Sequence, residues 1–222
     1  MGAGAQPVDE HRRRPPIPIV PVDDAARASA LAGGADAQRA WFAAATGNAS
    51  VVQPRTRFIG IGDVEVLRTT LAAHRDTPGM SVGAVALAVD TGRELAARAA
   101  AEGVQLLVAA APDGHDDAPA RAIADAFTGG SEHGPLGVLR RLGDATVAVL
   151  CGIALGAGEH GLAFAADDLV ALAGAAVAIG IEPDLRPRVV ARRTLGHPER
   201  DALAAHLGVL LIHPRREPGA RR

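Results

Sequence analysis

The sequence predicts an α/β fold in which a doubly wound parallel sheet has helices on both faces and follows a helical N-terminal portion. Two observations lead to this prediction. Short apolar runs of strand length alternate with longer, alanine-rich stretches whose apolar residues recur at helical spacing. Glycines stand where predicted helices end, as at Gly103 and Gly129. Because buried strands that alternate with helices form parallel sheets, the 222 residues, 48% of them hydrophobic, fit one Rossmann-like domain.

The first 80 residues are predicted to hold a leader and a helical portion. Residues 1–22 contain three arginines followed by four prolines, a composition typical of a flexible, extended segment. The portion 23–80 is predicted to contain one or two helices over 23–46, a short strand at 51–52, a strand over 57–62 that ends in a glycine turn, and a short helix over 63–74.

From residue 81 onward the patterns are clearer. Apolar residues at helical spacing predict a helix over 81–102, and Gly103 follows it as a natural C-terminal residue. The run 104–110 has the length and apolar content of a buried parallel strand. The α/β domain is expected to span 81–212, with a disordered tail over 213–222. Its later elements are predicted to be helices at 119–127, 136–142, 153–160, 168–179 and 199–207, and strands at 146–151, 162–166 and 189–190.

The residue types that are absent exclude several kinds of active site. All 23 basic residues are arginines and tyrosine is absent, which excludes a lysine Schiff base, a P-loop lysine and a tyrosine proton donor. Aromatic residues make up only 2% of the chain and the net charge is -2, so no nucleic-acid partner is expected. The single cysteine, Cys151, excludes an intrachain disulfide and is interpreted as a small core residue rather than a nucleophile.

No targeting or membrane segment is predicted. The prolines of the leader interrupt the apolar stretch that a signal peptide needs. The longest apolar run, 169–181, is shorter than the ~20 residues that span a bilayer, and it is interpreted as a buried helix or as a helix plus a strand. Together with the single cysteine, these features indicate a cytoplasmic protein.

Three stretches of the domain occur in an order that matches a known enzyme family. They are GRELA at 92–96 with EGVQLL at 102–107, GPLGVLRRLG at 134–143, and RPRVV at 186–190 with ALAAHL at 202–207. Together they resemble the nicotinate-nucleotide:dimethylbenzimidazole phosphoribosyltransferases, which make the lower-ligand nucleotide of cobalamin. The resemblance runs from Val82 to Leu211, a little over half of the chain, and identifies it as a truncated and divergent member.

The resemblance implies a function as well as a fold. The family transfers phosphoribose from nicotinate mononucleotide to dimethylbenzimidazole and releases nicotinate, with no cofactor. Its fold is a doubly wound parallel sheet, usually in a homodimer. The expected ligands are therefore nicotinate mononucleotide and a benzimidazole base. The alternative is a non-catalytic relative that binds a nucleotide or base, or that pairs with a full-length relative.

The chain departs from the family at residues that carry its chemistry. Where the family holds a phosphate with Asn-Thr-Thr at a helix N-terminus, this sequence has Asp116, Asp117 and Ala118. Each close carboxylate would repel a phosphate by about 1–4 kcal/mol. A second glycine-rich loop is missing between Gly130 and Gly134, and the segment with the family's catalytic glutamate is expected to be missing. Whether the chain is an active enzyme therefore stays open.

Five residues are candidates for substrate binding. They are Gly114, His115, Asp116 and Asp117, which follow the strand predicted over 104–110, and Asp167, which matches an aspartate at the end of a family strand. Ligands of α/β sheets bind at the carboxyl ends of the strands, so the loop and Asp167 are expected to lie close together. No catalytic residue is assigned. If the chain turns over, Asp167 or one of the loop aspartates must accept the proton of the incoming base.

Two of these groups also have plainer interpretations. Together with Asp113, the loop has the oxygen ligands of a divalent-cation site, but Asp116 and Asp117 are equally suited to cap the following helix, and no metal is predicted. Arg192 and Arg193 stand where the family has Ser-His. They are suited to grip a phosphate as a fork, or they form an exposed pair.

Overall fold

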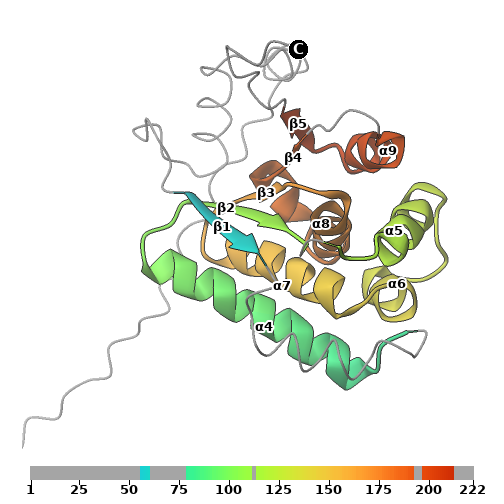
Figure 1. Cartoon of the computed structure of the whole chain (residues 1–222), viewed down its shortest axis with the longest axis horizontal. Helices are drawn as coiled ribbons and strands as arrows, with labels where there is room; N and C mark the ends of the chain where they lie inside the picture. The colour runs from blue at the N-terminus through green and yellow to red at the C-terminus, as the bar shows by residue number, and fades with distance from the viewer. Residues whose placement is uncertain (1–55, 61–78, 112–113, 193–196, 213–222) are drawn as a thin grey trace, which may run out of the picture.

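The computed structural model describes residues 56–60, 79–111, 114–192 and 197–212 (Figure 1). Within them, five parallel strands form one sheet in the order β1-β2-β3-β4-β5. The predicted α/β class and its parallel sheet are confirmed. The strands are β1 (Thr56–Gly60), β2 (Leu106–Ala110), β3 (Ala163–Ala166), β4 (Val189–Arg192) and β5 (Leu210–Ile212). The helices are α4 (Val82–Ala101), α5 (Ala118–Thr128), α6 (Pro135–Leu142), α7 (Ala145–Glu159), α8 (Leu169–Ile181) and α9 (Pro198–Leu207), with a 3-10 helix, η2 (Pro183–Arg188), before β4.

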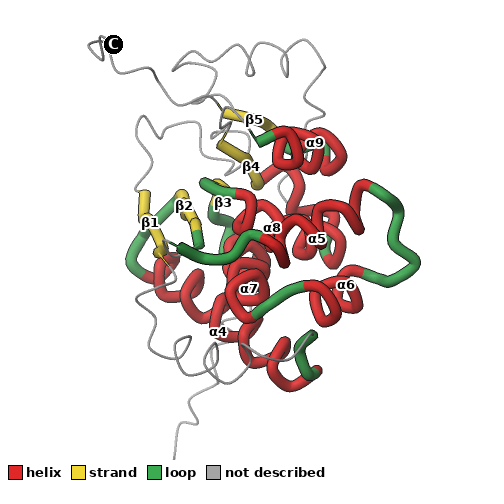
Figure 2. Tube along the Cα trace, turned by 45° about the vertical axis from the view of Figure 1, so that its right-hand side comes forward, coloured by secondary structure: helices red, strands yellow, loops and turns green. Residues whose placement is uncertain are grey.

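The described helices gather on one face of this sheet. Each strand pairs with the next strand in the chain, and right-handed crossovers between such neighbours return the helices to the same side. Leu107 and Phe164 pack with the helices in the main core, whereas Ala165 and Val190 belong to a separate cluster of strand residues. In Figure 2 the strands lie along one side of the helices. The strand order does not reverse, so over the described residues the predicted double winding and the helices on the second face are not seen.

The inner helix α7 differs from the sequence prediction. The sequence predicts a strand over 146–151 and a helix over 153–160, but the structure has one continuous helix. Because α7 is buried on all sides over almost its whole length, its sequence has no amphipathic pattern and is as apolar as a buried strand. Its first turn is fixed by Asp144, whose side chain accepts a hydrogen bond from the backbone N–H of Val147 at 2.9 Å.

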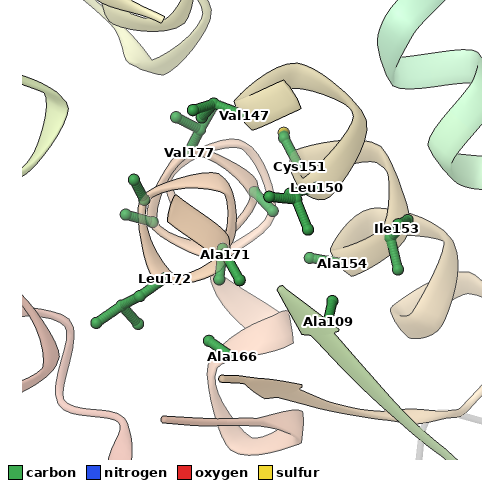
Figure 3. Packing of buried hydrophobic residues seen from close by; sticks show 14 of the residues in the cluster. Ala109, Val147, Leu150, Cys151, Ile153, Ala154, Ala166, Ala171, Leu172 and Val177 are labelled. Atoms are coloured by element: carbon green, nitrogen blue, oxygen red, sulfur yellow. The ribbon is translucent and has the colours of Figure 1, made fainter. Parts of the chain in front are cut away.

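A second inner helix, α8, packs beside α7 against the sheet. The predicted buried helix over 168–179 is confirmed, and side chains of α7 such as Leu150 face those of α8 and the sheet (Figure 3). Cys151 is fully buried in this core, and burial raises the pKa of its thiol to about 12. A thiol that stays protonated is a packing group, as predicted. No described helix is both long enough and apolar enough to cross a membrane.

Glycines allow α4 and α7 to approach until their backbones touch. A side chain on Gly92 would meet the backbone of α7 at Val149 and Ile153. A side chain on Gly152 would meet the backbone of α4 at Val89. Because the obstructing atoms are backbone atoms, no change of rotamer relieves the overlap. This close contact fixes the outer helix α4 against the inner helix.

Most of the other predicted elements are confirmed within a few residues. The helix predicted over 81–102 is α4, which begins after Ser81; the hydroxyl of Ser81 accepts a hydrogen bond from the N–H of Ala84 at 3.1 Å. Gly103 follows with φ +76°, a left-handed conformation that glycine adopts without strain. The other confirmed predictions are the strands that correspond to β1, β2, β3 and β4 and the helices that correspond to α5, α6 and α9.

The short strand β5 has no counterpart among the predicted elements. Three residues are too few to show a periodic pattern. The predicted elements at 23–46, 51–52 and 63–74, together with the leader and the tail, lie outside the described residues.

The contact between α4 and α7 can be tested with two glycine substitutions. Gly152→Ala is expected to lower the free energy of unfolding by about 1–3 kcal/mol or more, because the new methyl group overlaps backbone. Gly83→Ala is the control, since Gly83 is exposed on α4 with no atom within 4 Å of the added carbon, and it is expected to raise stability by up to about 1 kcal/mol. Urea denaturation measures both, and equal effects would contradict the close contact.

A candidate ligand site at the carboxyl ends of the strands

A cavity of about 270 Å³ lies where β2, β3 and β4 end. Parallel strands end at the same edge of a sheet, so the loops that follow them meet there, and ligands of α/β sheets bind at such edges. Asp117 and Asp167, which the sequence predicts separately, both line this cavity. The full lining is Asp117, Asp167, Asp168, Leu169, Arg192, His197 and Arg200.

Asp168 holds two strand ends together at the cavity. Its Oδ1 accepts a hydrogen bond from the N–H of Ala171 at 2.7 Å and so caps α8. Its Oδ2 accepts a hydrogen bond from the N–H of Ala111, just after β2, at 2.6 Å. Burial raises the pKa of this carboxyl, and the two backbone hydrogen bonds oppose the rise. Both oxygens are therefore committed to holding the fold.

Asp167 pairs with Arg192 between the ends of β3 and β4. The Arg192 Nη1 lies 2.9 Å from Oδ1 and 3.2 Å from Oδ2 of Asp167. Both side chains are partly exposed, so the pair adds little to stability. The pairing keeps a guanidinium group at the cavity wall. Arg193, the other half of the predicted fork, lies outside the described residues.

Arg200, on α9, brings a buried cation to the same cavity. Only 2% of the residue is exposed, and its Nη2 donates a hydrogen bond to the backbone carbonyl of Ala166, the last residue of β3, at 2.8 Å. Burial lowers the pKa of the guanidinium, while the carboxylates of Asp168 and Asp167 raise it. Because arginine keeps its charge at working pH, Arg200 offsets the negative charge of these neighbours.

The predicted loop residues Gly114 and His115 do not line the cavity. Gly114 has φ +78°, the left-handed conformation that lets the chain turn after β2. The Nε2 of His115 lies 3.0 Å from Oδ2 of Asp144, the cap of α7. The hydrogen bond with Asp144 raises the pKa of His115, burial lowers it, and the charges of Asp144, Asp117 and Asp168 raise it further. His115 therefore belongs to the support of the site.

The two loop aspartates have different surroundings. Asp116 Oδ1 accepts a hydrogen bond from the N–H of Ala118 at 2.9 Å, as in the capping interpretation. Asp117 stands at the N-cap of α5 but makes no capping bond there, and its Oδ2 lies 3.9 Å from Nη2 of Arg121. Over the described residues no three His, Cys, Asp or Glu side chains converge as a metal site would need. Asp113 lies outside those residues.

Three polar residues at the cavity, Asp168, His197 and Arg200, were not among the sequence candidates. The position of Asp168 could have been predicted in part, because an aspartate directly before an apolar helix is a typical N-cap. His197 and Arg200 belong to the start of α9, after β4. Since no spacing pattern relates them to the earlier strands, only the assembled sheet brings them to the aspartates.

A larger hollow lies between α4 and α6, away from the strand ends. Its volume is about 420 Å³, and its wall is mostly apolar, with Val82, Val89 and Leu136 among its residues. It contains none of the predicted site residues. Asp90, Arg93 and Arg140 also line this hollow, but charged residues make up most of the wall only at the smaller cavity.

Comparison with known proteins relates this site to one family. The sequence model of the family described as phosphoribosyltransferase matches residues 116–213, which include every residue of the cavity wall. Residues 116–213 are therefore similar to that family. Gly114 and His115 come just before the matched phosphoribosyltransferase region, and the cavity lies inside it.

Individual relatives match only part of this chain, and the chain spans no more than about half of their own length. The nicotinate-nucleotide–dimethylbenzimidazole phosphoribosyltransferase of Desulforudis audaxviator (strain MP104C) is 33% identical over 75 residues, 34% of this chain and 21% of that protein. The crystal structure of nicotinate-nucleotide-dimethylbenzimidazole phosphoribosyltransferase from Thermus thermophilus is similar with a TM-score of 0.56 and 26% identity, over 61% of this chain and 49% of that one. The structure of CobT from the same organism gives a TM-score of 0.54 and 26% identity, over 60% and 49%.

The double role of Asp168 predicts the cost of removing its side chain. Asp168→Ala loses the cap of α8 and the bond to Ala111, and it is expected to lower the free energy of unfolding by about 2–3 kcal/mol. Ser81→Ala, which removes one exposed cap, is expected to cost about 1 kcal/mol. Urea denaturation of both variants provides the comparison, and similar losses would mean that the bond to Ala111 adds nothing.

Proposed function

We propose that the cavity at the ends of β2, β3 and β4 binds nicotinate mononucleotide, and that the chain transfers its phosphoribose to dimethylbenzimidazole. The observation that supports this most is the position of the cavity. Loops of three neighbouring strands line it, and all of its lining residues fall within the region that matches the phosphoribosyltransferase family. The Desulforudis relative and the first Thermus structure are named for this activity.

The charges around the cavity suit a phosphorylated ribose. Arg192, His197 and Arg200 supply hydrogen-bond donors of the kind that bind phosphate. Asp117 and Asp167 supply acceptors for ribose hydroxyls. An approaching nucleotide thus meets cations as well as the carboxylates that would repel it.

The transfer needs one group that accepts a proton. A ring nitrogen of dimethylbenzimidazole attacks the anomeric carbon, and the bond from that carbon to nicotinate breaks with its electron pair leaving on nicotinate. The other ring nitrogen gives up its proton to a carboxylate. Asp117 suits this role best, because Asp167 is paired with Arg192 and both oxygens of Asp168 accept backbone hydrogen bonds.

The proposal is tested by measuring nicotinate release. The protein is incubated with nicotinate mononucleotide and dimethylbenzimidazole, and free nicotinate is separated and quantified. Nicotinate release that depends on the protein supports the transfer. A fall in the rate of release by about 10²-fold or more in Asp117→Asn supports Asp117 as the proton acceptor. Release that is unchanged in this variant contradicts the role of Asp117 but not the transfer.

A second function, binding without turnover, is favoured by one observation. Two of the three carboxylates at the cavity are engaged by protein donors, so a single aspartate is left to act as a base. Such a relative would hold the nucleotide or the base, or pair with a full-length relative. A ligand at 100 times its Kd adds about 2.7 kcal/mol of stability. A shift of the thermal midpoint by nicotinate mononucleotide without nicotinate release would therefore support this alternative, whereas the lack of both would contradict the two functions together.

The phosphate contact predicts a loss of affinity in one arginine variant. Arg192→Ala is expected to weaken binding of nicotinate mononucleotide by roughly 10- to 100-fold, since a charged hydrogen bond is worth about 1.5–3 kcal/mol. Arg98→Ala is the matched control, because Arg98 is an exposed residue of α4 that pairs only with Glu94 at 3.6 Å among the contacts described. Isothermal titration calorimetry measures both affinities. An unchanged Kd in Arg192→Ala would contradict the proposed contact between Arg192 and the phosphate.

A further inference from the structure

Two contacts tie the loop between β2 and α5 to other parts of the fold. Asp168 accepts the N–H of Ala111 where the loop begins, and His115 contacts Asp144 nearer to Asp117. His115 Nε2 lies 3.0 Å from Oδ2 of Asp144, whose other oxygen accepts a hydrogen bond from Val147 at 2.9 Å. Among the described contacts, the side chains of Asp116 and Asp117 bond within the loop and to α5. Between Ala111 and the start of α5, the described part of the loop is therefore held to another element through His115.

The anchor at the other end of this contact is rigid. Asp144 caps α7, which is buried on nearly all sides and packs against α4 and α8. The His115 side chain is 11% exposed and that of Asp144 29%, so solvent screens their interaction only in part. A contact between a turn and a fixed helix end can set the position of that turn.

We propose that the His115–Asp144 pair is a proton-controlled latch that positions Asp117 on the nucleotide cavity. With the imidazole protonated, the pair is an ion pair with a charge-assisted hydrogen bond, and the loop is held to α7. With the imidazole neutral, a weaker hydrogen bond remains and the loop is free to shift. The identity of the ligand rests on the proposed function, but the latch itself does not.

The surroundings of the imidazole determine the direction of the effect. The groups that act on it are Asp144 at the start of α7, Asp117 on its own loop and Asp168 at the start of α8, all of which favour the charged form, while burial opposes it. The imidazole contacts Asp144 through Nε2, while its buried Nδ1 has no hydrogen-bond partner in the described part of the chain. Because the pKa of His115 is raised above 6.5 in the fold, the ion pair is complete below that pH and is lost as the pH rises through the raised value.

The latch predicts a linkage between protons and ligand. Nicotinate mononucleotide should bind wild type about fivefold or more tightly than His115→Gln at about pH 6, and equally at about pH 9. By reciprocity, binding near neutral pH should take up protons, which calorimetry in two buffers of different ionisation enthalpy measures directly. The ligand phosphate titrates in every variant alike, so the comparison removes its contribution.

Two further variants distinguish the effect of losing the ion pair from a general effect on folding. Asp144→Asn keeps the cap of α7, since asparagine is as good a cap as aspartate, but removes the charge, and it should match His115→Gln. His160→Gln is the control, because His160 is an exposed histidine at the opposite end of α7, and it should match wild type. The same pH dependence of Kd in wild type and His115→Gln would overturn the latch.

A measurement without ligand separates this inference from the proposed function. Hydrogen exchange gives protection factors for the amides of residues 114–118 at about pH 6 and about pH 8. Protection that falls with pH in wild type but not in His115→Gln supports the latch even if nicotinate mononucleotide does not bind. Protection that is independent of both pH and His115 overturns the latch, whatever the ligand results.

Discussion

The cavity depends on a single half-buried carboxylate that joins the ends of two neighbouring strands. Asp168 accepts the N–H of Ala171 at the start of α8 and the N–H of Ala111 at the end of β2, so the loops after β2 and β3 are held at a fixed separation. Arg200 adds a third element, because α9 is bonded through it to the last carbonyl of β3. The groups that wall the cavity are therefore also its supports.

This arrangement changes the electrostatics that the sequence suggests for the acidic loop. In the sequence alone, Asp116 and Asp117 would both repel a phosphate, but the structure turns Asp116 to a backbone N–H of α5. Of these two aspartates, Asp117 is the one that lines the cavity. Arg192 and Arg200, which come from later parts of the chain, line it as well. A loop that is acidic in sequence thus contributes one carboxylate to a wall that also carries cations, which is compatible with a ligand bearing both a phosphate and hydroxyl groups.

Local patterns predict most elements but not their arrangement in space. Amphipathic spacing and end residues locate α4, α5 and α9, because each has one buried face. The same reasoning fails over 145–159, where burial on every side removes the periodicity that separates a helix from a strand. Sequence patterns predict that Asp117 and Asp167 lie close together, because parallel strands end at the same edge of a sheet. They do not predict that His197 and Arg200 join them, because that depends on which strands are neighbours.

The rigidity of α7 explains why a contact at its first turn has consequences for the cavity. A hydrogen bond transmits position only if one partner is fixed, and α7 is fixed by backbone contacts at Gly92 and Gly152 that leave no room for a shift. The capping carboxylate of Asp144 thus serves two purposes, capping the helix with one oxygen and holding His115 with the other. Because His115 and Asp117 are two residues apart, the fixed start of α7 is connected through this contact to the cavity wall.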